Sequence, residues 1–290
     1  MKLLVPGGSG YVGAGILRRV PPEWKIAATF LAHPFEQSGV AAFRVDVRDA
    51  DAVNRLFDGF RPDIVIHTAA LMSGEEMMAV NVDGSRHIAR AATRYHARLI
   101  HLSSDVIFDG EHAPYDESAS TAPITPYAES KARAEQVIQE EYADPVIVRT
   151  SLVYGFAPMD PRTRQTLDGE MPRLFTDEYR CPICVDDLAD ALIELAQKPV
   201  FSEKTGFSAL NIAGPQRLSR HEFGVELARA FGVEPRFQPA LSASSPTPRP
   251  RDCALDISRA QKLLRTRLRS VDQVITEWRN EHLPLRAVQG

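Results

Sequence analysis

Residues 2–13 read KLLVPGGSGYVG, a short apolar segment followed by a glycine-rich turn. Residues 2–5 predict a β-strand, and residues 11–20 predict a helix that ends before Pro21, because proline cannot continue a helix. Gly7, Gly10 and Gly13 therefore fall at a strand-to-helix junction. Such a turn lets backbone N–H groups approach a pyrophosphate, and the helix N-terminus adds partial positive charge. The stretch favours a dinucleotide-binding turn over an ordinary loop.

Short β-branched segments alternate with helical patterns over the first half of the chain. The expected strands are residues 2–5, 25–30, 42–45, 63–67, 98–102 and 145–149, and the expected helices are 11–20, 49–60, 77–95 and 126–142. This alternation predicts βαβ units and an α/β fold with a Rossmann-type, doubly wound parallel sheet. After about residue 152 the pattern weakens, which predicts a smaller α+β domain. We expect a dinucleotide-binding domain over 1–152 and a substrate-binding domain over 153–290, with part of the latter returning to the first domain.

The composition excludes several classes of protein. The chain has 290 residues, of which 44% are hydrophobic and 25% charged, as is ordinary for a globular protein. Its 34 basic and 38 acidic residues give a net charge of −4, which argues against binding to nucleic acids or acidic membranes. No apolar run approaches the roughly 20 residues that span a bilayer. Without a signal peptide, and with an odd count of 3 cysteines, the expected location is cytoplasmic.

A second motif carries the chemistry. Tyr127 and Lys131 are four residues apart, so both side chains lie on one face of the expected helix. The Lys131 ammonium should lower the pKa of the Tyr127 phenol, which can then exchange a proton with a carbonyl or an alcohol. Ser104 closely follows the C-terminal end of the strand predicted over 98–102, at the edge where α/β sheets bind ligands. Either element alone is common, and strand-end serines often only cap turns. Their order after the glycine turn favours a catalytic Ser104, Tyr127 and Lys131.

The loose glycine spacing is similar to that of short-chain dehydrogenases/reductases, in which an acidic residue closing the second strand binds the ribose 2′-hydroxyl of NAD. Here residues 28–33 read ATFLAH and contain no carboxylate. This absence favours NADP(H) as the cofactor and leaves NAD(H) open.

Several further stretches resemble the dTDP-4-dehydrorhamnose reductase family of extended short-chain reductases. They are residues 101–110, 114–117, 126–131, 149–155 and 185–189. The resemblance extends over nearly the whole chain and implies that Ser104 orients the substrate carbonyl, Tyr127 protonates it and Lys131 binds the nicotinamide ribose. Implied cofactor contacts are Gly7, Gly10, Tyr11, Val12, Gly13, Phe30, Asp46, Val47, Ala69, Ala70, Leu71, Tyr127, Lys131 and Thr150. Expected substrate contacts are Ser104, Asp105, Leu152, Arg180 and Arg249, the two arginines as donors to a diphosphate.

The implied activity is NADPH-dependent reduction of a nucleotide-linked keto-sugar. Leu152 replaces a tryptophan of the family, and residues 69–75 depart from its pattern, so the sugar stays open. A sugar-nucleotide 4-epimerase shares the same three catalytic residues. A non-catalytic NADP-binding subunit, similar to the beta subunit of methionine adenosyltransferase, is a third option, and a homodimer is left open.

Two other features are interpreted as structural. Cys181 and Cys184 form a single CxxC, which we expect to pack inside the protein rather than bind zinc. No metal site is predicted. Asn81 resembles a helix asparagine of extended family members that supports the catalytic lysine.

Overall fold

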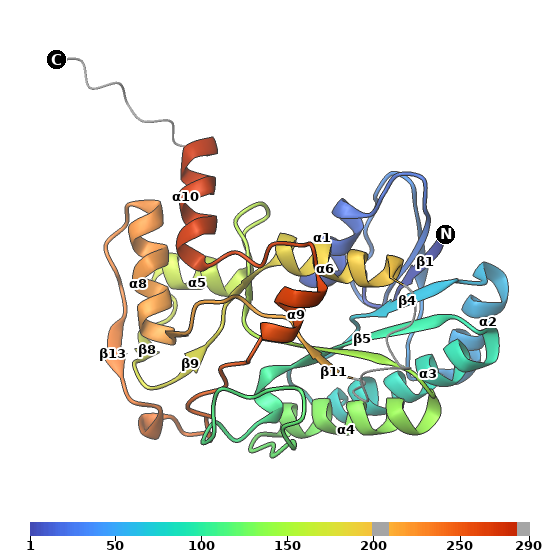
Figure 1. The fold of residues 1–290 in the computed structure, drawn as a ribbon, viewed down its shortest axis with the longest axis horizontal. Coiled ribbons are helices and arrows are strands. Elements are labelled where there is room, and N and C mark those ends of the chain that lie inside the picture. The colour runs from blue at the N-terminus through green and yellow to red at the C-terminus, as the bar shows by residue number, and fades with distance from the viewer. Residues whose placement is uncertain (199–208, 283–290) are drawn as a thin grey trace.

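A seven-stranded parallel sheet forms the centre of the larger lobe (Figure 1). The structure, a computed structural model, describes residues 1–198 and 209–282, so the last eight residues of the expected C-terminal domain lie outside it. The strands, in sheet order, are β11 (Ala209–Asn211), β6 (Val146–Thr150), β5 (Arg98–Ser104), β4 (Ile64–His67), β1 (Lys2–Val5), β2 (Lys25–Phe30) and β3 (Val40–Arg44). The chain order reverses between β1 and β4, which confirms the predicted doubly wound sheet and marks the ligand-binding edge.

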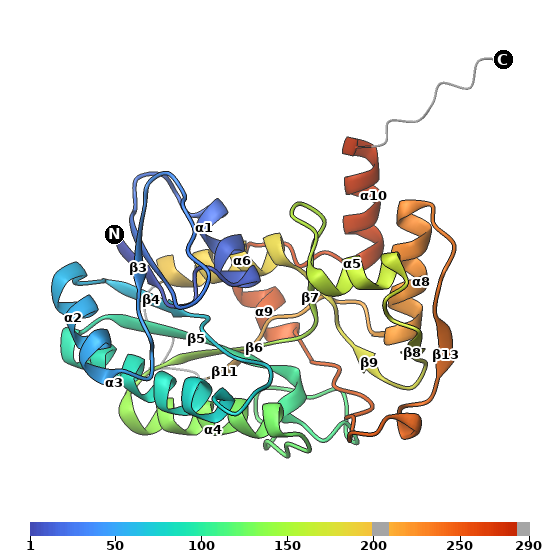
Figure 2. The ribbon, with the colours of Figure 1, turned by 180° about the vertical axis from the view of Figure 1, so that it is seen from behind.

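Helices cover both faces of this sheet (Figures 1 and 2). One layer contains α1 (Tyr11–Arg19) packed on α6 (Val185–Gln197), with α9 (Ser258–Leu263) beside β11. The other contains α2 (Ala50–Phe60), α3 (Gly84–Tyr95) and α4 (Pro126–Glu141). The central strands are apolar because both faces are covered, and all four residues of β4 are buried. Since α6, β11 and α9 all follow residue 152, late segments of the chain complete the large lobe.

Three predicted elements differ from the observed ones by more than one residue. β5 extends to Ser104 instead of ending at residue 102. β3 covers Val40–Arg44 instead of 42–45, because the residues that pair with β2 begin at Val40 and end at Arg44. The expected helix over 77–95 begins with a π-helical turn, Ala79–Asp83, before α3. Asn81 explains the turn, because its side chain binds the backbone of Leu71 through both its oxygen and its nitrogen. A widened helical turn of this kind is often found at functional sites.

The smaller lobe is built from short strand pairs and helices. The pairs are β7 (Val153–Tyr154) with β10 (Ile183–Cys184), β9 (Tyr179–Arg180) with β12 (Leu218–Ser219), and β8 (Arg173–Phe175) with β13 (Gln238–Ala240). Its helices are α5 (Pro161–Asp168), α8 (Arg220–Phe231) and α10 (Val271–His282), and α8 contacts both others. Short 3-10 turns occur at Asp105–Ile107 and Ser242–Ser244. Tyr154, Phe223, Leu227 and Val271 belong to a separate apolar core, so this lobe has its own interior.

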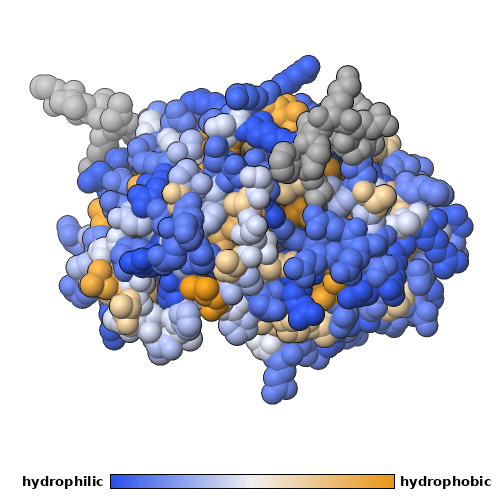
Figure 3. Space-filling view, turned by 60° about the horizontal axis from the view of Figure 1, so that its bottom comes forward, coloured by the Kyte–Doolittle hydropathy of each residue, from blue (hydrophilic) through white to orange (hydrophobic). Residues whose placement is uncertain are grey.

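The surface is mainly polar on the face seen in Figure 3, where hydrophobic side chains appear in scattered positions. Among the described residues, no helix is both long and apolar enough to cross a membrane.

Candidate active site

The glycine turn, residues 7–13, lies at the carboxyl end of β1 and opens α1. Gly7 has φ +87°, and a Cβ at Gly13 would lie 2.3 Å from the Gly7 carbonyl oxygen, so both positions require glycine. Gly10 caps α1 without a side-chain hydrogen bond, and the first helical turn contains no acidic residue. No side chain therefore occupies the backbone N–H groups of the first turn of α1. These groups can bind an anion, and the helix dipole favours one there. This arrangement fits the pyrophosphate of a dinucleotide.

Four other predicted cofactor residues, Ala69, Ala70, Leu71 and Phe30, come from the ends of β4 and β2 near this turn. A Cβ on Gly7 would meet the Ala69 backbone at 2.5 Å, so the end of β4 abuts the turn, and Ala70 and Leu71 continue from it with exposed side chains. Thr29 Oγ1 accepts a hydrogen bond of 3.1 Å from Gly7 N, which holds the end of β2 and Phe30 beside the turn. These contacts group the turn with the ends of β2 and β4.

The remaining predicted cofactor residues differ in orientation. Tyr11 donates its hydroxyl to the Pro158 carbonyl at 3.1 Å, so its side chain points to the smaller lobe, and Val12 is half-buried. Val47 is buried against Gly84, whereas Asp46 keeps a partly exposed carboxylate held by Arg48. Thr150 is buried beside Ser104 in the β5–β6 register, and its hydroxyl has no hydrogen-bond partner in the described residues.

Ser104 and Tyr127 meet at the carboxyl end of β5. Thr125 caps α4 by accepting a hydrogen bond from Ala128 N, which places Tyr127 in the first turn of the helix. Ser104 lies close enough to Tyr127 to influence the pKa of the phenol, and its own hydroxyl donates to Asp105 Oδ1 at 3.3 Å. Both are partly exposed, whereas the neighbouring Ser103 is buried. Of the two serines, Ser104 is therefore the one that can share a substrate oxygen with Tyr127.

The predicted effect of Lys131 on Tyr127 is wrong in this structure. Burial, followed by the nearby Asp105 carboxylate, raises the pKa of Tyr127 to about 12, and the nearby Ser104 hydroxyl opposes this rise. Lys131 points to the interior instead, where Nζ donates to the Leu102 carbonyl at 2.6 Å. The phenol is therefore protonated at neutral pH, which suits a proton donor to a ketone.

Lys131 occupies a buried polar network. Its Nζ lies 3.4 Å from His101 Nε2, and burial lowers the Lys131 pKa to about 8. Ser130, the preceding residue, accepts a hydrogen bond of 2.8 Å from Asn81 Nδ2. The π-helical turn at Asn81 is thus joined to the helix that carries Tyr127 and Lys131.

Arg180 does not face a free surface, contrary to the prediction of a diphosphate contact. It is buried, its Nη2 lies 3.3 Å from Glu178 Oε1, and its Nη1 donates to the Pro250 carbonyl at 3.1 Å. Its Nε lies 3.7 Å from the buried Asp105 carboxylate, which also accepts a hydrogen bond of 2.5 Å from Ser151. Internal acceptors therefore surround Arg180.

Sequence reasoning missed a charged side chain nearby, that of Arg220. It is 8% exposed, and its guanidinium has no hydrogen-bond or ion-pair partner among the described residues. Burial lowers its pKa to about 10, and the next contributions come from Glu178 and from Arg162, Arg180 and Arg249. Arg220 is the first residue of α8, where the helix dipole disfavours a cation. A cation directly after the Ser219 capping box is the signal that could have revealed it.

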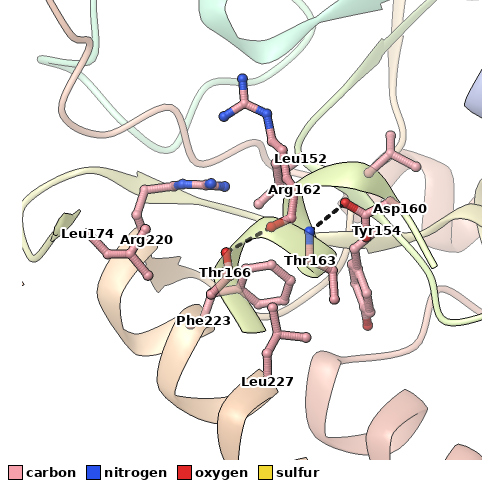
Figure 4. Close-up of a pocket in the computed structure, with 12 residues that line it drawn as sticks. Leu152, Tyr154, Asp160, Arg162, Thr163, Thr166, Leu174, Arg220, Phe223 and Leu227 are labelled. Carbon is pink, nitrogen blue, oxygen red and sulfur yellow. Dashed lines mark hydrogen bonds between the residues drawn. The ribbon is translucent and has the colours of Figure 1, made fainter. Parts of the chain in front are cut away.

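We call Arg162, Arg180, Arg220 and Arg249 the arginine cluster. Figure 4 shows Arg162 and Arg220 reaching from α5 and α8 into one pocket, which Leu152 also lines. Glu178 is buried among these cations, and Arg249, which is partly exposed, donates from Nη2 to it at 2.9 Å. Arg162 also acts electrostatically on Tyr127, so the cluster lies on the Tyr127 side of the lobe. With two acidic partners, Asp105 and Glu178, for four arginines, the cluster is suited to an anionic ligand.

All three cysteines are buried, and burial raises the pKa of Cys181 and of Cys184 to about 11. In the described part of the chain, no group of three or more His, Cys, Asp or Glu side chains is arranged to hold a metal ion.

Comparison with known proteins places this geometry in context. A family model described as the RmlD substrate binding domain matches residues 1–283. A dTDP-4-dehydrorhamnose reductase from Mycobacterium tuberculosis is 29% identical over 277 residues, covering 90% of this chain and 86% of that protein. Methionine adenosyltransferase 2 subunit beta from Pongo abelii is 24% identical over 283 residues, covering 90% and 82%.

Among solved structures, dTDP-4-dehydrorhamnose reductase from Bacillus anthracis, in complex with NADP, superimposes with a TM-score of 0.80. The alignment covers 97% of this chain and 99% of that one, at 20% identity. At this identity, the likeness supports the fold.

Proposed function

Because the chain belongs to the RmlD substrate binding domain family, we propose that it is an NADPH-dependent reductase of a nucleotide-linked keto-sugar, of the dTDP-4-dehydrorhamnose reductase type. The observation that carries the proposal is that the hydroxyls of Ser104 and Tyr127 are neighbours at the carboxyl edge of the sheet. The glycine turn opens at the same edge, after β1. A dinucleotide-binding turn and a proton donor on one sheet edge are what a carbonyl reduction requires.

The catalytic residues have separate tasks in this proposal. When bound, NADPH supplies the hydride that the ketone carbon receives. Tyr127 gives its phenolic proton to the ketone oxygen, and Ser104 donates a hydrogen bond to the same oxygen. Tyr127 and Ser104 together stabilise the negative charge that develops on oxygen. Lys131, whose Nζ donates to the Leu102 carbonyl, would bind the nicotinamide ribose rather than act on the phenol.

The arginine cluster supports an anionic, nucleotide-linked substrate. Arg220 is a buried cation without an acceptor, so a diphosphate would satisfy donors that the protein leaves unpaired. Arg162 lines the same pocket, and the partly exposed Arg249 lies close enough to act electrostatically on Arg220, so both would add donors. We therefore assign the diphosphate to Arg162, Arg220 and Arg249, with Leu152 on the sugar side. The homodimer and the cytoplasmic location predicted from the sequence stay predictions.

The test is an assay of dTDP- and UDP-linked 4-keto-sugars with NADPH, following both cofactor absorbance and the sugar product. We expect one oxidised NADPH for each alcohol formed. Interconversion of sugar epimers with tightly retained NAD⁺, and no net NADPH consumption, would instead identify an epimerase. No turnover of any keto-sugar, combined with NADPH-dependent capture of a methionine adenosyltransferase catalytic subunit, would favour the non-catalytic option.

A further inference from the structure

A cation lies where the sequence lacks the acidic residue that selects NAD. β2 and β3 are parallel neighbours, and their register pairs Phe30 with Arg44, the last residues of both strands. Arg44 Nε donates to the Leu31 carbonyl at 3.3 Å, so the guanidinium is held against the segment that follows β2. Arg44 comes from the next strand, 14 positions after Phe30, which is why inspection of residues 28–33 could not find it.

This strand end is in contact with the glycine turn. Thr29 binds Gly7 N, and a Cβ on Gly8 would meet the Phe35 ring at 3.4 Å. Phe35 in turn packs edge-to-face on Phe30, with ring centroids 6.2 Å apart. A dinucleotide whose pyrophosphate binds at the glycine turn extends its adenosine ribose towards the end of β2. The ribose would therefore lie beside Phe30 and Arg44.

Arg44 differs from Arg48, the other arginine close to this edge. Arg48 is neutralised by Asp46, at 2.6 Å, and by Glu76. Arg44 is exposed and forms no ion pair with a carboxylate in the described part of the chain. Its charge is thus uncompensated, and its terminal guanidinium nitrogens keep their donors for a ligand.

We propose that Arg44 binds the 2′-phosphate of the adenosine ribose and selects NADP(H) over NAD(H). The inference rests on the proposed function only in requiring a nicotinamide dinucleotide at the glycine turn. Arg44 would supply a bidentate, charge-assisted contact to the phosphate, which a ribose hydroxyl cannot replace. It would thereby take the place that an acidic residue on β2 has in proteins that bind NAD.

Equilibrium binding tests this assignment without the reaction. Calorimetry would compare 2′,5′-ADP with 5′-AMP, which lacks the 2′-phosphate, on the natural chain, Arg44→Ala and Arg44→Lys. We expect Arg44→Ala to weaken 2′,5′-ADP about tenfold to a hundredfold and 5′-AMP little, with Arg44→Lys intermediate. The difference should shrink as salt increases, because the site is exposed. Arg55→Ala, which removes an exposed arginine of α2, is the matched control.

The outcomes separate this inference from the proposed function. Equal weakening of both nucleotides by Arg44→Ala, no weakening of either, or no binding of 2′,5′-ADP by the natural chain would overturn the assignment. Selective weakening of 2′,5′-ADP would support it even if no keto-sugar is reduced, in which case only the proposed reductase activity fails.

Discussion

In the proposed function the glycine turn binds the cofactor and the arginine cluster binds the substrate, and the two regions offer different kinds of donor to an anion. The turn uses backbone N–H groups at the start of α1, and it needs glycine for the positive φ at position 7 and for space at positions 7 and 13. The cluster uses charged side chains, one of which, Arg220, is buried without a partner. The first site is therefore compatible with a stable fold, whereas the second opposes stability until a ligand binds.

The largest effect is expected at Tyr127, which in the proposed function stands between the bound cofactor and the bound substrate. Tyr127→Phe removes the proton donor while keeping the ring, so we expect kcat to fall about 10²- to 10⁴-fold. NADPH affinity, measured by calorimetry, should change little. Tyr142→Phe, at the other end of α4, is the control, since that hydroxyl only binds the Ala97 carbonyl. Near-normal turnover of Tyr127→Phe would remove the acid role.

A change at Gly13 tests whether the turn depends on backbone geometry alone. An added Cβ would lie 2.3 Å from the Gly7 carbonyl oxygen and 2.8 Å from Gly8 Cα, so Gly13→Ala must open the turn. We expect NADPH to bind about tenfold to a hundredfold more weakly, as overpacking of 1–3 kcal/mol would produce. Gly59→Ala, where a Cβ has nothing within 4 Å, should leave binding unchanged. Equal affinities for both variants would contradict the assigned role of the turn.

The same contrast explains what could be predicted from the sequence. The glycine turn and the Tyr127–Lys131 spacing are local sequence patterns. The βαβ alternation around them predicts that both lie at the carboxyl edge of one parallel sheet. The arginine cluster joins α5, β9, α8 and the loop at Arg249, which only tertiary packing brings together. The prediction for Arg180 fails for this reason, because its internal acceptors Asp105 and Pro250 are distant in the sequence. The direction of the Tyr127 pKa depends likewise on burial and on Asp105.

Arg220→Met tests whether the buried arginine contributes to substrate binding at the expense of the free energy of unfolding. Loss of the guanidinium should raise the KM for the keto-sugar nucleotide about tenfold to a hundredfold, with a smaller effect on kcat. The free energy of unfolding should rise by up to about 3 kcal/mol, because the buried charge is removed. Arg229→Met, on the same helix but exposed and paired with Glu226, should change neither quantity appreciably. Unchanged KM with reduced stability would assign Arg220 a structural role instead.

Lys131→Met tests whether a buried charge also destabilises the proposed cofactor site. Most of that site is formed by backbone groups, and Lys131 is a charged side chain within it. Burial lowers the Lys131 pKa from 10.5 to about 8, so below pH 8 the folded protein carries a disfavoured ammonium. Removing it should stabilise the fold at pH 7 by about 1–2 kcal/mol, since the lost hydrogen bond to Leu102 offsets part of the gain.

The pH dependence of this difference identifies its cause. Because the folded pKa is below the unfolded one, the unfolded chain binds more protons between pH 8 and 10.5, and the natural protein gains stability as pH rises through that window. Denaturant unfolding at several pH values should therefore show the advantage of Lys131→Met shrinking above pH 8. Lys262→Met, at an exposed position of α9, is the control for the loss of a lysine outside the interior. An advantage of Lys131→Met that stays constant to pH 10.5 would mean that packing, rather than the buried charge, sets the stability at this position.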